Sequence, residues 1–126
     1  MSYDVEMIIN VGGQVPAVVA VIGNMTSNVG SMYVRAMPHR PGMLGRYGGY
    51  GEPEDRAGLT GLSGMTGEAA LPILDEGVRY MRDHAEEMRA LEPEDRWGTF
   101  EAAFEFLQDV RSACEEAPGA TLTVSW

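Results

Sequence analysis

The sequence predicts an α+β fold, in which helices pack on one face of a small antiparallel sheet. Apolar residues alternate with polar ones near both ends of the chain, recur every three or four positions in its second half, and are interrupted by glycine and proline between these segments. The element order is β-β-α-loop-α-α-β. Because 126 residues suffice for one core, we expect a single domain over residues 1–126.

A hairpin and a short helix are expected first. Alternation over residues 3–11 predicts a strand, and a continuous run of small apolar residues over 17–22 predicts a second strand. Turn residues at 12–14 lie between them, which favours an antiparallel hairpin. Polar residues over 24–28 offer N-caps for a short helix that Pro38 ends. Its apolar face would consist of Val29, Met32, Tyr33 and Ala36.

Two longer helices and a last strand follow. Apolar spacings of three and four predict one helix over 68–91, and Thr99 can cap another. The inner face of the latter would consist of Phe100, Ala103, Leu107, Val110 and Cys114. Trp97 would pack the loop between the two helices. Residues 120–126 alternate again, so we expect a strand that returns beside the hairpin.

The acidic residues are concentrated in the second half of the chain. The formal net charge is −10, and residues 68–116 carry fourteen acidic side chains against five arginines. This balance disfavours direct nucleic-acid binding and allows a basic protein partner. All nine basic residues are arginine, so an anion site would use guanidinium groups and backbone amides.

The chain lacks the features of secreted, membrane-spanning or catalytic proteins. Its one cysteine, Cys114, excludes an internal disulfide framework, and no apolar run reaches the roughly 20 residues that span a bilayer. We therefore expect a cytoplasmic protein without membrane contacts. His39 and His84 are isolated, and no phosphate-binding loop, dinucleotide motif or nucleophile elbow is present. We expect neither a metal, nor a cofactor, nor catalysis.

A glycine-rich segment over residues 38–67 holds nine of the sixteen glycines. A connection of this length is usually functional or disordered, and both interpretations stay open. Glycine permits close approach to a ligand, and arginine suits an anion. Tyr47 and Tyr50 could stack on a base while an arginine holds a phosphate. The arginines in or beside this segment are Arg35, Arg40, Arg46 and Arg56.

The end of this segment repeats glycine every third residue, from Gly58 to Gly67. Its leucines and methionine require burial, so we expect a turn-rich ribbon that folds onto the core or onto a second subunit. That arrangement would bring Thr60, Ser63 and Thr66 to one polar edge.

Asn24, Thr26 and Asn28 form a polar cluster before the first helix. Such side chains commonly cap backbone amides. Alternatively, they would present amides and carboxamides to a phosphate, a base edge or a ribose hydroxyl. The local sequence is compatible with both roles.

Two short motifs resemble a family of small phage and prokaryotic proteins of unassigned function. One is Asn24-Met25-Thr26-Ser27-Asn28-Val29, followed by Met32, where the family usually shows Asn-x-Thr-His-Asn or Asn-x-Thr-Ser-Asn. The other is a loop with Pro93 and Trp97-Gly98 before a helix, followed by Cys114, Pro118 and a terminal strand over Ala120 to Ser125. The resemblance implies a phage accessory protein but no activity. Ser27 stands where some relatives have histidine, which disfavours a metal ligand there.

Together these observations predict a non-catalytic phage accessory protein, acting in counter-defence, that sequesters an anionic, nucleotide-type signal in a homo-oligomer. Its ligand-binding residues would be Asn24, Thr26, Asn28, Arg35, Arg40, Arg46, Tyr47, Tyr50, Thr60 and Ser63. One alternative is an acidic inhibitor that blocks a basic surface of a host defence protein. It would use Glu86, Glu87, Glu94 and Asp95. Another alternative is a minor structural or assembly protein.

Overall fold

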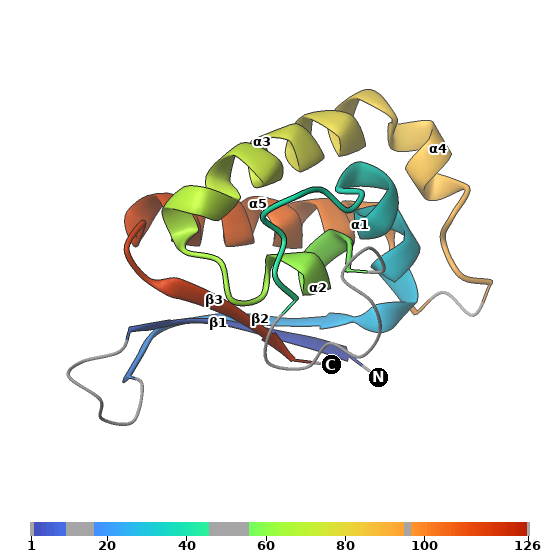
Figure 1. Cartoon of the computed structure of the whole chain (residues 1–126). Coiled ribbons are helices and arrows are strands. Elements are labelled where there is room, and N and C mark those ends of the chain that lie inside the picture. The colour runs from blue at the N-terminus through green and yellow to red at the C-terminus, as the bar shows by residue number, and fades with distance from the viewer. Residues whose placement is uncertain (1, 10–16, 46–55, 95–96, 126) are drawn as a thin grey trace.

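A computed structural model of the chain shows a three-stranded antiparallel sheet with helices on one face (Figure 1). The structure describes residues 2–9, 17–45, 56–94 and 97–125. The strands are β1 (Ser2–Ile9), β2 (Ala17–Thr26) and β3 (Thr121–Ser125), in the order β2-β1-β3. The predicted α+β fold is thus confirmed, including the return of the last strand beside the first. The turn predicted at 12–14 lies outside the described residues.

Helices form two layers above the sheet. They are η1 (Ser27–Val29), α1 (Gly30–Ala36), α2 (Gly58–Leu62), α3 (Gly67–Asp83), α4 (Ala85–Arg89) and α5 (Phe100–Glu116). α5 packs on β1 and β2, and α3 packs against α5 and α1. Thr66 caps α3 and Thr99 caps α5, each through a hydroxyl that accepts an amide hydrogen bond. These caps fix where the two long helices begin.

The strand register separates an apolar face from a polar face. Val5 pairs with Val124, and both are buried under the helices. The neighbouring row joins Asp4 to Asn24 and to Ser125. Because opposed residues in a sheet share a face, this row lies on the side away from the helices.

Two element boundaries differ from the prediction. β2 continues past residue 22 to Thr26, since its pairing with β1 extends to the Ser2–Thr26 pair. The helix predicted over 68–91 is interrupted at His84, whose φ of −120° and ψ of 35° are not helical. The interruption turns α4 so that Met88 is completely buried.

The glycine repeat at the end of the glycine-rich segment forms α2 and a turn, not the expected ribbon. Leu59, Leu62 and Met65 are buried, which confirms that this segment folds onto the core. The Gly64 amide donates to the Leu122 carbonyl at 2.8 Å, and the Leu122 amide donates to the Met65 carbonyl at 2.8 Å. These bonds join the segment to β3. None of the helices in the described ranges is long and apolar enough to cross a bilayer.

Candidate functional site

A polar hollow of about 500 Å³ lies where β1 begins, β2 ends and the loop before α5 passes. Its size falls within the range of about 300–1,000 Å³ typical of small-molecule sites. We call it the Trp97 hollow, and its lining residues are Ser2, Asn24, Thr26, Asn28 and Trp97. The lining combines uncharged hydrogen-bonding groups with one indole.

Strand pairing orients the Asn24 side chain. Its Nδ2 donates to Ser2 Oγ and to Asp4 Oδ1, each at 2.8 Å. Because the Asp4 carboxylate only accepts hydrogen bonds, the amide nitrogen must face it. The carbonyl oxygen of Asn24 is thereby fixed on the opposite side of the carboxamide.

Thr26 and Asn28 differ in what they do locally. The hydroxyl of Thr26 accepts from the Asn28 backbone amide at 3.3 Å and caps η1, which is the structural role considered for this cluster. Within the described residues, the Asn28 carboxamide makes no hydrogen bond of its own, and the residue is exposed. Asn28 therefore offers a donor and an acceptor to the hollow.

Trp97 reaches the hollow because the next residue is glycine. Gly98 has a φ of +114°, and a Cβ there would lie 2.7 Å from Val29 Cγ1 and 2.9 Å from Thr26 Cγ2. Beyond it, Glu92 accepts from the Phe100 amide at 2.8 Å, and Thr99 accepts from the Ala102 amide at 3.1 Å. These two bonds fix the loop at the start of α5, and the close contacts of Gly98 place it beside Thr26 and Val29.

The Trp97 side chain is 70% exposed, so the expectation that it packs the loop between the late helices is wrong. The close approach at Gly98 instead places the indole at the edge of the hollow. Two segments far apart in the sequence, Asn24 to Val29 and Trp97-Gly98, consequently lie side by side.

Two of the predicted arginines are engaged with acidic helices. Arg35 Nη1 lies 2.6 Å from Glu87 Oε1, and Arg40 Nη1 lies 2.7 Å from Glu76 Oε2. Neither arginine lines the Trp97 hollow. Their ion pairs tie α1 to α4 and the loop after α1 to α3.

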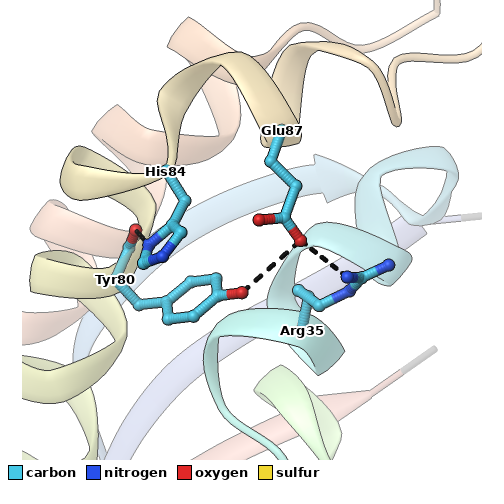
Figure 2. A network of polar contacts seen from close by, with 4 residues as sticks. All are labelled: Arg35, Tyr80, His84 and Glu87. Carbon is cyan, nitrogen blue, oxygen red and sulfur yellow. Dashed lines mark hydrogen bonds and ion pairs between the residues drawn. The ribbon is translucent and has the colours of Figure 1, made fainter.

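Figure 2 shows that Glu87 is also part of a small network on α3 and α4. The Tyr80 hydroxyl lies 3.5 Å from the same Glu87 oxygen, and the ring of His84 stacks on that of Tyr80 with centroids 3.9 Å apart. His84 Nδ1 is 2.9 Å from the Tyr80 carbonyl oxygen. Glu87, one of the carboxylates considered for a basic partner, is therefore committed within the chain, while Glu86 and Glu94 are exposed.

The remaining predicted residues divide into two groups. Thr60 Oγ1 donates to the Ala57 carbonyl at 3.0 Å, and the completely buried Ser63 accepts from the Val124 amide at 2.9 Å. Both hydroxyls bond backbone groups away from the hollow. Arg46, Tyr47, Tyr50 and Asp95 lie outside the described residues.

Ser2 and Trp97 also line the hollow, but neither is among the ligand-binding residues that the sequence predicts. The signal for Trp97 was the glycine that follows it, because a positive φ brings the loop to another element. Ser2 had no comparable signal, since its place depends on the register with Thr26.

Other reactive groups lie elsewhere. Burial raises the pKa of the Cys114 thiol to about 12, so that this side chain stays protonated in the core. Among the described residues, no group of three or more His, Cys, Asp or Glu side chains could hold a metal ion.

Comparisons of the chain with models of known protein families, with curated proteins and with solved structures find no match. The chemistry of the hollow is accordingly inferred from its own side chains.

Proposed function

We propose that the protein is a non-catalytic binding protein that holds a nucleotide-type small molecule, with the nucleobase in the Trp97 hollow. The observation that carries this proposal is the exposed indole of Trp97 beside the carboxamides of Asn24 and Asn28. An indole face stacks on any base. A carboxamide pairs its donor and acceptor with the edge of a base, as asparagine does with adenine.

The orientation of each polar group supports a base in this position. Asn24 presents a carbonyl acceptor, because its amide nitrogen is held by Ser2 and Asp4. Asn28 adds a donor and an acceptor. A base carries amino donors and ring-nitrogen or carbonyl acceptors, so its edge can meet both groups while its face lies on Trp97.

The biological role that we propose is sequestration of a nucleotide signal by a phage accessory protein that acts against a host defence. Two observations support this role. The lining of the Trp97 hollow is polar, and the two motifs that meet there resemble those of a family of small phage and prokaryotic proteins. Holding a signal without converting it requires affinity, and the hollow offers stacking and hydrogen bonding to the base.

The test is isothermal titration calorimetry of the full chain with AMP, GMP, CMP and UMP in turn. At least one should bind. Because stacking on an aromatic side chain contributes about 1–3 kcal/mol per base, Trp97→Ala should weaken that nucleotide by about 5- to 150-fold. Trp97→Phe keeps an aromatic face and should retain most of the affinity.

Arg40→Gln is the matched control, since it alters a partly exposed ion pair that does not line the hollow. It should bind as the wild type does. Absence of binding by all four nucleotides, or equal binding by the wild type and Trp97→Ala, would overturn the proposal. The acidic-inhibitor alternative would then be tested through charge reversal at the exposed Glu86 and Glu94.

A further inference from the structure

A second hollow, of about 370 Å³, opens between α3 and α5 and is rich in arginine. We call it the arginine hollow, and its lining residues are Asp75, Val78, Arg79, Arg82 and Arg111. Three arginines and one acidic residue thus line a single hollow in a protein whose net charge is −10. It shares no lining residue with the Trp97 hollow.

Helix geometry explains why these side chains gather. Asp75, Arg79 and Arg82 are spaced by four and then three residues along α3, so they project from one face. That face adjoins α5, which contributes Arg111 (Figure 1 shows the two helices side by side). The sequence spacing on α3 alone could not reveal the third arginine.

Arg111 is the fixed member of the group. Its Nε donates to Asp75 across the helix interface, and its Nη1 donates to Glu115 Oε2 at 2.7 Å. Two carboxylates therefore hold the guanidinium in place. A cation that is already positioned loses less conformational freedom when an anion arrives.

Arg79 and Arg82 are the members whose charges are least compensated. Within the described residues, no carboxylate lies within 4.0 Å of Arg79. Among the residues that the structure describes, Arg82 has one carboxylate contact, at 3.6 Å from Asp83, and both of these side chains are more than half exposed. Exposed pairs of this kind contribute little energy and open easily.

We propose that the arginine hollow binds a phosphate-bearing small anion, such as a diphosphate group. Guanidinium forks donate pairs of hydrogen bonds to phosphate oxygens, so the less compensated forks of Arg79 and Arg82 can each contact one of two linked phosphates. The site is independent of the proposed nucleobase site, because the two hollows have no residue in common.

The experiment is a calorimetric titration of the full chain with inorganic pyrophosphate at low ionic strength. We expect saturable binding that Arg79→Gln and Arg82→Gln each weaken by about fivefold or more, since charge-assisted hydrogen bonds are lost. Added salt should weaken binding as well. Both substituted side chains are exposed, so the fold should be retained, and circular dichroism checks this.

Arg40→Gln is again the matched control, because it removes the same charge at an ion pair elsewhere. It should leave pyrophosphate binding unchanged, as should Trp97→Ala. Lack of saturable binding at millimolar pyrophosphate would overturn this proposal, and so would equal weakening by Arg40→Gln and Arg79→Gln. Loss of nucleotide binding in Trp97→Ala, measured separately, reports only on the Trp97 hollow.

Discussion

Ser63, the residue that follows α2, joins the end of that helix to β3. A serine between glycines looked suited to an exposed polar edge. The structure buries it completely, and its hydroxyl accepts the Val124 amide of β3 at 2.9 Å. Residue type could predict hydrogen bonding here. It could not predict the partner, which lies 61 residues away.

Replacement of Ser63 by alanine should destabilise the protein by about 1–3 kcal/mol, because a buried backbone amide loses its acceptor. Urea unfolding of the wild type and the variant measures the difference. Thr60→Ala is the control, since the Thr60 hydroxyl donates to a carbonyl within its own turn and is only partly buried. Equal losses in the two variants would contradict the assigned role of Ser63.

At the scale of elements, the helices and strands with strong apolar periodicity were predicted correctly. The features that depend on tertiary packing were not. The hairpin strands, α3 and α5 follow from alternation and from apolar spacing. α2 did not, because its glycines disfavour a helix and its formation depends on the burial of Leu59 and Leu62. The interruption at His84 likewise depends on the packing of Met88, which no local pattern reports.

Two glycines of α3 provide an element-scale prediction. A Cβ on Gly67 would lie 2.8 Å from the Ala117 carbonyl oxygen and 2.9 Å from that of Cys114. These are backbone atoms at the end of α5, so Gly67→Ala should cost about 1–3 kcal/mol. The gain from helix propensity is small here, because Gly67 is the first residue of α3 and the value of about 1 kcal/mol applies to a helix interior.

Gly77→Ala is the comparison within the same helix. Its Cβ would approach Met37 Cγ at 2.7 Å, and a methionine side chain can rearrange. We expect a smaller loss than for Gly67→Ala, measured as the difference in urea midpoint. If Gly67→Ala were the more stable variant, the close packing of α3 on the end of α5 would be incorrect.

At the scale of the whole molecule, composition predicted the charge distribution and the single core but not the position of a site. The Trp97 hollow needs Asn28 and Trp97 to meet although 69 positions separate them in the sequence. The arginine hollow needs α3 and α5 to pack at one register. Both hollows depend on tertiary contacts. The sequence could therefore predict some of the lining residues but not which of them lie together.

The core also sets how stability responds to alkaline pH. Burial raises the pKa of Cys114 from 9.0 to about 12 and raises that of Tyr33 above its usual range. The Tyr33 hydroxyl donates to the Ala103 carbonyl at 2.8 Å, which joins α1 to α5. In the unfolded chain both groups release their protons at lower pH than in the folded protein, so above pH 9 the unfolded state binds fewer protons.

Stability should therefore be unaffected by these two groups below pH 9 and should fall as the pH rises from 9 toward 12. Thermal unfolding between pH 8 and pH 11 measures this, and we expect a decrease in Tm of at least about 4 °C. Cys114→Ala removes one of the two titrating groups, so its Tm should decline less steeply, whatever its value at pH 8. An equally steep decline in Cys114→Ala would show that the buried thiol does not contribute to the alkaline loss of stability.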